Sequence, residues 1–245
     1  MKTHWRSFLA LAMFAVATSR ADELLFQDDF KGKLGDGWSW VREHREFWRV
    51  TQRGLEVCIE PGNMWGPAND ARNLLVRGAP DATKGEVEVS VYVENTPSEQ
   101  YEQVDLVWYY DDSHMVKIGR ELVDGKLSVV MGREQDDRTQ TIAIVPLQIP
   151  VSVRLVPFTD TRTNRHVAIA QTDVAAVRLR LRVKGGHVRG QFRAPDSGGW
   201  REAGECDLPT PANGNAKISL QFYQGPAHIE HWARVTEFRV RRSGE

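Results

Sequence analysis

Apolar and polar residues alternate with a period of two along most of the chain from residue 22 onward. The stretch EVEVSVYV at 86–93 places its four valines on one face and mostly polar residues on the other. The stretches 54–61, 177–184 and 217–224 repeat this alternation, and no sustained 3.6-residue periodicity accompanies them. A strand with one apolar and one polar face is typical of an antiparallel sheet, so the pattern predicts an all-β protein.

Residues that favour tight turns separate the strand-like runs. They are Arg53-Gly54, Asp124-Gly125, Gly185-Gly186, Ser197-Gly198-Gly199 and Asn213-Gly214. A chain of 245 residues is a common size for one β-sandwich. We therefore expect a single domain over residues 22–245, with a dozen or more strands in two packed antiparallel sheets. Residues 146–172 fit either an added hairpin or a long excursion.

The first 21 residues have the organisation of a secretory signal peptide. Lys2 and Arg6 precede an apolar run at 8–17, and small residues at Ser19 and Ala21 place the cleavage after Ala21. The run is short for a membrane span, although an uncleaved anchor is the alternative. We predict a secreted or periplasmic protein with no transmembrane segment in the mature chain.

Charge and cysteine content narrow the range of partners. The net charge of −1 argues against a nucleic-acid partner, which would favour a clear basic excess. The two cysteines, Cys58 and Cys206, leave two readings open. Export would permit a disulfide between them, whereas the alternative is two small buried thiols.

Residues 103–131 predict two consecutive hairpins whose registers agree with each other. A turn at 111–113 pairs Tyr110 with His114 and Asp105 with Gly119, and a turn at 124–125 pairs Glu121 with Ser128. Both registers assign the same faces. The predicted core face carries Val104, Leu106, Trp108, Tyr110, Val116, Ile118, Leu127, Val129 and Met131, and the predicted solvent face carries Gln103, Asp105, Tyr109, Lys117, Gly119, Glu121 and Ser128.

The polar face of these hairpins contains a candidate binding site. Gly119 lies opposite Asp105 in the predicted register and leaves a gap in the side-chain layer, and Lys117 and Glu121 are both diagonal to Asp105. Such a gap, also bordered by Tyr109, could receive a small polar ligand. The alternative is a solvated ion pair worth under about 1 kcal/mol.

The stretch YEQVDLVWYYDDSHMVKIGRELVDGKLSVV at 101–130 resembles an uncharacterised bacterial secreted family with the concanavalin A-like lectin/glucanase fold. This family is related to the C-terminal β-sandwich of β-xylosidases. The stretches DDF at 28–30, NLLVRGAP at 73–80 and TEFRVRR at 236–242 also fit. The resemblance implies a jelly-roll sandwich. The chain departs from the family at Val104-Asp105, where Ala-Gly is usual.

The fold implied by the resemblance often holds sugars on a concave sheet face, through aromatic side chains with neighbouring amides and carboxylates. The ligand-binding candidates are Gln103, Asp105, Tyr109, Lys117, Glu121, Gln221 and Tyr223, with Trp40, Trp65 and Trp200 in adjoining loops. For those tryptophans the alternative is packing.

The resemblance also implies a structural Ca²⁺ held near the chain ends, for which Asp28, Asp29 and Glu237 are the candidates. No other cofactor is expected. His228 and His231 could form a metal pair, but a solvated or hydrogen-bonded role is the simpler interpretation.

Three functions remain open. The favoured one is an exported carbohydrate-binding or carbohydrate-associated module without catalysis. A glycoside hydrolase would use Asp105 and Glu121, whose predicted separation approaches the about 6.5–9.5 Å of inverting enzymes. A structural or partner-binding domain would use the arginine strip at 178, 180 and 182, with Arg189 and Arg193 nearby.

Overall fold

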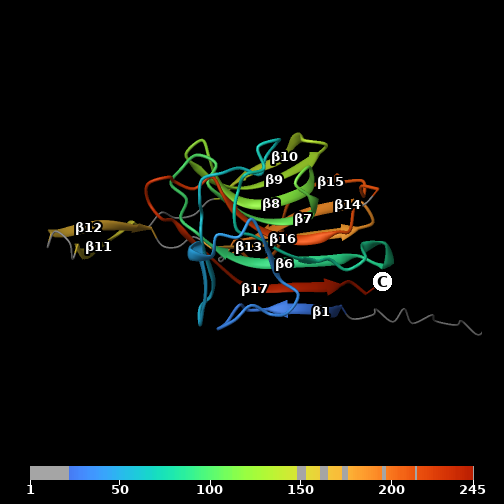
Figure 1. Cartoon of the computed structure of the whole chain (residues 1–245), viewed down its shortest axis with the longest axis horizontal. Helices are drawn as coiled ribbons and strands as arrows, with labels where there is room; N and C mark the ends of the chain where they lie inside the picture. Colours follow the sequence, from blue (N-terminus) through green and yellow to red (C-terminus); the bar gives the residue numbers. More distant parts are fainter. Residues whose placement is uncertain are drawn as a thin grey trace, which may run out of the picture.

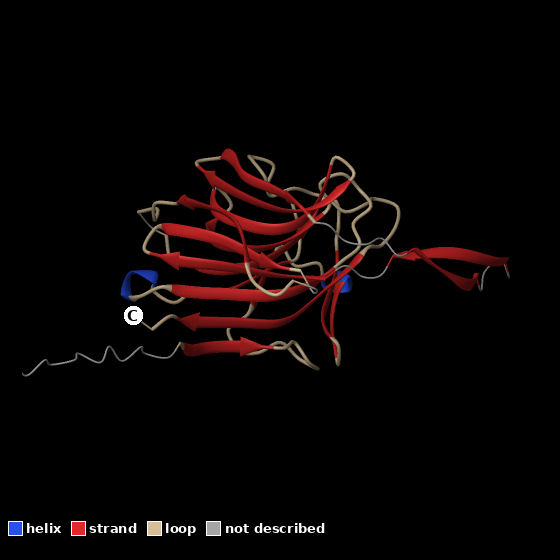
Figure 2. Cartoon of the chain, turned by 180° about the vertical axis from the view of Figure 1, so that it is seen from behind, coloured by secondary structure: helices blue, strands red, loops and turns tan. Residues whose placement is uncertain are grey.

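The computed structural model describes residues 22–147, 153–160, 165–172, 176–194, 197–212 and 214–244, with backbone only between 153 and 172. The predicted signal peptide lies outside these residues. The described chain forms seventeen strands and two short 3-10 turns, η1 (Arg45–Phe47) and η2 (Ala82–Lys84). Figures 1 and 2 show most of the strands in two stacked layers, as expected for an all-β sandwich.

One layer is an eight-stranded antiparallel sheet with the order β15-β14-β13-β6-β17-β4-β3, in which β1 also pairs with β17. Its strands are β1 (Glu23–Asp28), β3 (Trp48–Thr51), β4 (Gly54–Cys58), β6 (Val87–Glu94), β13 (Ala176–Lys184), β14 (His187–Arg193), β15 (Arg201–Asp207) and β17 (Trp232–Arg242). The first half of β17 pairs with β4 and the second half with β1.

The other layer is a seven-stranded antiparallel sheet with the order β10-β9-β8-β7-β16-β5-β2. Its strands are β2 (Ser39–Val41), β5 (Leu74–Gly78), β7 (Gln103–Asp111), β8 (His114–Val123), β9 (Lys126–Gln135), β10 (Arg138–Pro146) and β16 (Lys217–Tyr223). The segment that fitted either a hairpin or an excursion is a hairpin of β11 (Val153–Asp160) and β12 (Arg165–Thr172).

The core lies between the two large sheets and is built from the alternating apolar positions. All four valines of β6 are buried there, as are the apolar residues of β13. Trp108 and Ile118 enter the same core from the seven-stranded sheet, with exposures of 2% and 0%. Period-two patterning therefore predicted the inner face of both layers correctly, except that Leu127, predicted for the core, is half-buried and outside this cluster.

The outer face of the seven-stranded sheet is covered, contrary to the prediction that it meets water. A second apolar cluster lies on it and comprises Met64, Ala71, Leu74, Val76, Val107, Tyr109, Met115 and Tyr223, with Trp65 and Val41 beside it. Met64 and Ala71 come from the segment between β4 and β5, which crosses this face. The prediction was wrong here because an irregular segment, which has no periodicity to read, provides the cover.

The paired registers of β7, β8 and β9 agree with the prediction at most positions. Asp105 pairs with Gly119 and Glu121 with Ser128. The prediction was wrong at the first turn, where His114 pairs with Asp111 instead of Tyr110. Tyr110 is an extra residue in a bulge, so the turn shortens by one residue while Tyr110 still faces the core.

The two cysteines are free thiols. Cys58 lies in β4 and Cys206 in β15, and four strands separate them in the eight-stranded sheet. At about 4.8 Å per strand spacing, five spacings place them roughly 24 Å apart. A disulfide needs Cα atoms within about 7 Å, so these residues do not pair within one molecule.

We expect both thiols to react slowly in the native protein. Burial raises the pKa of Cys58 to about 11 and that of Cys206 to about 11, so little thiolate is present near neutral pH. A colorimetric thiol assay at about pH 8 should therefore be slow for native protein and fast for two thiols after denaturation. Two thiols that are titratable only after reduction would contradict the arrangement.

Candidate functional site

A pocket of about 450 Å³ lies on the outer face of the seven-stranded sheet. Strands β7 to β10 form its floor, and the loops before β5, β7 and β9 and after β16 form its walls. Its lining residues are Asn63, Trp65, Tyr101, Gln103, Lys117, Glu121, Val123, Asp124, Val130, Thr141, Ile144 and Gln224. Alternation along β8 and β9 directs Lys117 and Val130 to this face because their neighbours fill the core, and Glu121, four residues after Lys117 on β8, shares it.

Lys117, on β8, is part of the pocket floor. Its ammonium donates hydrogen bonds to Gln103 Oε1 and to the Tyr223 hydroxyl, the latter at 3.3 Å. Its Nζ atom lies 3.7 Å from Asp105 Oδ2 and 3.5 Å from Glu121 Oε2. The predicted grouping of one lysine with two carboxylates is therefore present, but it is buried. The exposed side-chain fraction is 4% for Lys117, 0% for Asp105 and 8% for Glu121.

Asp105 fills the gap that the sequence placed above Gly119. A Cβ atom built on Gly119 would lie 1.5 Å from Asp105 Oδ1 and 2.7 Å from its Cγ. The space is therefore not available to a ligand, and this part of the prediction is wrong. The missing side chain of Gly119 instead gives Asp105 room to lie flat against β8.

Burial dominates the electrostatics beneath the pocket. It raises the pKa of the Asp105 carboxyl, against the opposing effect of the Lys117 ammonium. Burial likewise raises the pKa of Glu121, where Lys117 opposes the shift and Asp105 adds to it. The pKa of Tyr223 rises well above its usual value because of burial and the nearby Asp105 carboxylate. The single ammonium of Lys117 therefore does not fully offset the penalty that burial imposes on the ionised forms of Asp105 and Glu121.

Glu134 on β9 is a third buried carboxyl of this face. Its Oε2 atom accepts a hydrogen bond from the Gly66 amide at 3.0 Å, which anchors the loop that carries Trp65. Burial raises the pKa of Glu134 from 4.5 to about 7, and the Gly66 hydrogen bond limits the rise. The folded protein therefore retains this proton at pH values where the unfolded chain has lost it.

We expect Glu134→Gln to change how stability depends on pH. Between pH 4.5 and about 7 Glu134 increasingly destabilises the folded wild type. The unfolded chain loses the Glu134 proton in this range, whereas the buried carboxyl of the folded state resists ionisation. Relative to the variant, the wild-type free energy of unfolding should fall by about 3 kcal/mol as the pH rises through this window. Urea titrations at several pH values measure it, with exposed Glu99→Gln as the control. Parallel curves for wild type and Glu134→Gln would contradict the assignment.

The predicted ligand-binding residues separate into three groups. Gln103, Lys117 and Glu121 line the pocket. Asp105, Gln221 and Tyr223 are fully buried on the same face of the sheet, with exposures of 0%. Tyr109 belongs to the outer apolar cluster, and its hydroxyl donates to Asp112 at 2.7 Å.

Of the three predicted loop tryptophans, one reaches the pocket. Trp65 lines it, and the edge of its indole lies over Gly132, where a Cβ atom would come within 2.5 Å of the ring. Trp40 packs against Trp48 with ring centroids 4.7 Å apart, and Trp200 stacks under the Arg180 guanidinium at 3.9 Å. Trp40 and Trp200 therefore have the packing role that was the alternative to ligand binding.

The sequence did not indicate several lining residues, among them Asn63, Tyr101 and Gln224. All three come from irregular segments, where no periodicity indicates which way a side chain points. Tyr101 and Gln224 have positive φ angles of 69° and 59°, and Gln224 donates to Asn63 Oδ1 at 3.1 Å. An aromatic residue two positions before a predicted strand, Tyr101, was the one signal in the sequence for this part of the site.

The three calcium candidates do not form one ligand set. Asp28 accepts hydrogen bonds from the Phe30 and Gly35 amides and the Trp38 indole. Asp29 pairs with Arg239 and Glu237 with Arg178. In the part of the chain that the structure describes, no group of three or more His, Cys, Asp or Glu side chains could hold a metal ion.

The histidine pair is also not assembled for metal binding. His231 contacts both carboxylate oxygens of the buried Glu102 at 3.1 Å, which is the hydrogen-bonded role expected as the simpler interpretation. Glu102 also accepts from the Ser98 amide at 2.8 Å, so the pair holds the loop before β7.

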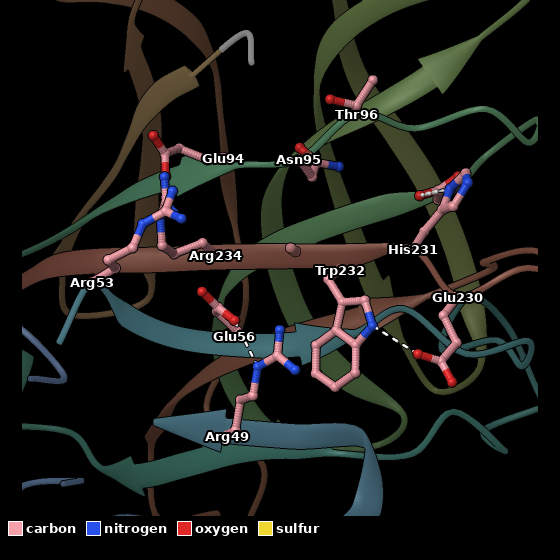
Figure 3. A pocket seen from close by; sticks show the side chains of 12 residues that line it. Arg49, Arg53, Glu56, Glu94, Asn95, Thr96, Glu230, His231, Trp232 and Arg234 are labelled. Atoms are coloured by element: carbon pink, nitrogen blue, oxygen red, sulfur yellow. Dashed lines mark hydrogen bonds and ion pairs between the residues drawn. The ribbon is translucent and has the colours of Figure 1, made fainter. Parts of the chain in front are cut away.

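A second pocket of about 440 Å³ lies on the outer face of the eight-stranded sheet (Figure 3). Arg49, Glu56, Arg234 and Glu94 are cross-strand neighbours on β3, β4, β17 and β6, so charges of opposite sign alternate across it. Arg49 bonds Glu56 at 2.7 Å and Arg234 bonds Glu94, and the Arg49 guanidinium stacks on Trp232 at 4.3 Å. These groups largely satisfy one another.

The arginine strip on β13 is likewise paired. Arg178 binds Glu237 at 2.7 Å, Arg180 binds Glu88 at 2.9 Å, and Arg182 binds Glu86. Each arginine therefore has an acidic partner on β6 or β17, or directly before β6. The strip presents little uncompensated positive charge to a partner.

The geometry defines a concanavalin A-like β-sandwich: two stacked antiparallel sheets, with the pocket lined by Trp65 on the outer face of the seven-stranded sheet. The chain belongs to the family described as the beta xylosidase C-terminal concanavalin A-like domain, whose model matches residues 27–210. The resemblance inferred from residues 101–130 is thereby confirmed. A comparison with curated proteins gives no match.

Solved structures support the same fold. A GH43 protein from Bacillus licheniformis aligns with a TM-score of 0.68 and 15% identity, over 87% of this chain and 38% of that protein. A xylan beta-1,4-xylosidase from Bacillus halodurans aligns with a TM-score of 0.65 and 15% identity, over 97% of this chain and 41% of that protein. A functionally unknown protein from Saccharomyces cerevisiae aligns with a TM-score of 0.58 and 12% identity, over 85% of this chain and 98% of that protein.

This chain thus spans about two fifths of the two bacterial proteins and nearly the whole of the yeast protein. Across the described residues, no helix is long and apolar enough to cross a membrane.

Proposed function

We propose that this chain is a carbohydrate-binding module that holds a saccharide in the pocket of about 450 Å³ on the seven-stranded sheet, hereafter the Trp65 pocket, and does not transform it. The observation that carries the proposal is the lining of that pocket. Two aromatic side chains, Trp65 and Tyr101, border a floor of amide and charged groups that includes Gln103 and Glu121. Sugars present apolar ring faces and a belt of hydroxyls, which this combination suits.

The amides of the pocket wall strengthen the proposal. Asn63 and Gln224 are joined by a hydrogen bond, and Gln224 retains a buried Oε1 atom that has no hydrogen-bond partner among the described residues. A saccharide hydroxyl could donate to it and recover the cost of that unsatisfied acceptor. Membership of a family named for β-xylosidase domains agrees with a carbohydrate-associated role.

Burial of Asp105 weighs against the hydrolase alternative. A glycosidase needs two carboxyl groups that reach the scissile bond from either side. Asp105 has no exposed surface, and Lys117 lies within 3.7 Å of it and 3.5 Å of Glu121. We therefore propose binding without turnover. Reducing-end assays on every sugar that binds test this, and turnover that disappears in Glu121→Gln but survives Lys126→Ala would favour the hydrolase.

The paired state of the arginine strip weighs against the third hypothesis, a partner-binding surface on β13. Export remains part of the proposal and rests on residues 1–21 alone. Mass spectrometry of the protein from its host should find a chain that begins at Asp22 outside the cytoplasm. A chain retained in the cytoplasm with its first 21 residues would contradict export.

Trp65→Ala should abolish most of the saccharide affinity. Loss of a stacking platform removes apolar contact and cation–π support for the Lys117 ammonium, which lies 4.8 Å from the Trp65 ring centroid. We expect a loss of at least about tenfold in affinity, or about 1.4 kcal/mol, for the best ligand of a glycan array. Calorimetric titration measures it.

Trp200→Ala is the matched control, because it removes a tryptophan that stacks on the arginines of the other sheet. It should bind like wild type. Equal affinity for wild type and Trp65→Ala, or a loss confined to Trp200→Ala, would contradict the proposed location.

A further inference from the structure

The charge of the Trp65 pocket is unbalanced. Its wall and floor contain the carboxylates of Glu121 and Asp124 against the single ammonium of Lys117. Glu134 on the same outer face is mostly protonated at about pH 6, because burial raises its pKa to about 7, so it adds little charge. Asp105, a further carboxyl of this face, is buried 3.7 Å from the same ammonium. Among the described lining residues, no second lysine or arginine offsets them. Negative charge that is not matched in a buried site attracts a cation.

Glu121 has unused bonding capacity within this pocket. It is 6% exposed, and its Oε2 atom is buried without a hydrogen-bond partner among the described residues. Lys117 lies 3.5 Å from this oxygen and already donates to Gln103 and Tyr223. A ligand that brings a charged donor would satisfy the oxygen and offset the excess charge.

The rim adds a second acceptor and an aromatic wall. Asp124, in the turn between β8 and β9, accepts a hydrogen bond from Gln100 at 3.2 Å through Oδ1. Tyr101 is 47% exposed beside it, and Ile144 across the pocket is 48% exposed. The rim therefore combines an acidic group with uncovered apolar surface that a sugar ring can contact.

We propose that the ligand class of this pocket is an amino sugar with a free ammonium group, taken in preference to a neutral saccharide. The inference rests on the proposed carbohydrate-binding function and specifies its ligand. The ammonium is held by Glu121 with Asp124 nearby, and the ring lies against Trp65 and Tyr101. N-acetylation removes the positive charge and leaves an amide that cannot neutralise the pocket.

Glucosamine oligomers and their N-acetylated counterparts of equal length test the proposal. Calorimetric titration at about pH 6 keeps the amines protonated, since an amine of this type has a pKa near that of an α-amino group, about 8. We expect the free amines to bind at least about tenfold more tightly, and we expect added salt to reduce this preference. Glu121→Gln should reduce the preference to less than about threefold, whereas exposed Glu99→Gln should retain it.

The outcomes separate this inference from the proposed function. Equal or tighter binding of the N-acetylated oligomers overturns the ammonium assignment. So does binding confined to neutral sugars of a glycan array, and both results leave carbohydrate binding in place. Absence of binding to every saccharide tested overturns the assignment and the proposed function together. If Glu121→Gln does not fold, Asp124→Asn provides the same comparison from the exposed rim.

Discussion

Replacing Gly119 with alanine is expected to destabilise the sandwich by about 3 kcal/mol or more. The added methyl group would lie 1.5 Å from Asp105 Oδ1 and 3.1 Å from the Val104 carbonyl oxygen. Asp105 has no free space to enter, because it is fully buried beside Lys117 and pairs across the sheet with Gln221. Relief would therefore require a shift of β7 or the loss of the ion pair. Chemical denaturation followed by circular dichroism measures the change.

Gly78→Ala is the matched control, since a Cβ atom at that strand glycine meets nothing within 4 Å. It should change stability by no more than about 0.5 kcal/mol. The double variant Asp105→Ala with Gly119→Ala should lose less stability than Gly119→Ala alone, because it removes the clash. A Gly119→Ala protein as stable as wild type would show that Asp105 does not occupy the space.

Lys117→Met should cost about 3–5 kcal/mol of stability, the usual penalty for removing one partner of a buried charge group. It leaves Asp105 and Glu121 without their shared cation, and it leaves Gln103 and Tyr223 without a donor. Both carboxyls already have a raised pKa. Without the ammonium their ionisation becomes costlier, so the penalty should grow as the pH rises and shrink as the acids are protonated.

Lys126→Met, at an exposed position of the next strand, is the control and should be nearly neutral. Denaturant titrations of both variants at about pH 5 and pH 8 provide the comparison. A Lys117→Met loss that is no larger than that of Lys126→Met, or that does not depend on pH, would contradict the buried charge group.

The inner architecture could be predicted because it depends on alternation. In a strand, successive side chains point to opposite faces, so the pairing of Asp105 with Gly119 fixes the direction of Trp108 and Ile118 as well. The turn at Asp124-Gly125 was equally legible, because both residues adopt positive φ angles of 49° and 69° that suit a two-residue hairpin. The bulge at Tyr110 could not be predicted. The sequence does not show whether Asp111 is the last residue of the strand or the first residue of the turn.

The site was only partly predictable, for a related reason. Lys117, Glu121 and Gln103 sit on regular strands, so their common face followed from the register. The cover over that face comes from the irregular segment that carries Met64 and Trp65, and its path depends on tertiary contacts such as the Gly66–Glu134 hydrogen bond. Sequence spacing could indicate a grouping of charges but could not indicate how deeply it is buried.

Chemical-shift mapping with the best saccharide of a glycan array locates the binding site residue by residue. We expect saturable amide and side-chain shifts at 63–65, 101–103, 117–124 and 224, including the Trp65 indole, with no change at 49–56 or 230–234 on the opposite sheet. Saturable shifts confined to the opposite sheet, or no shifts with any saccharide, would contradict the claim that the Trp65 pocket binds carbohydrate.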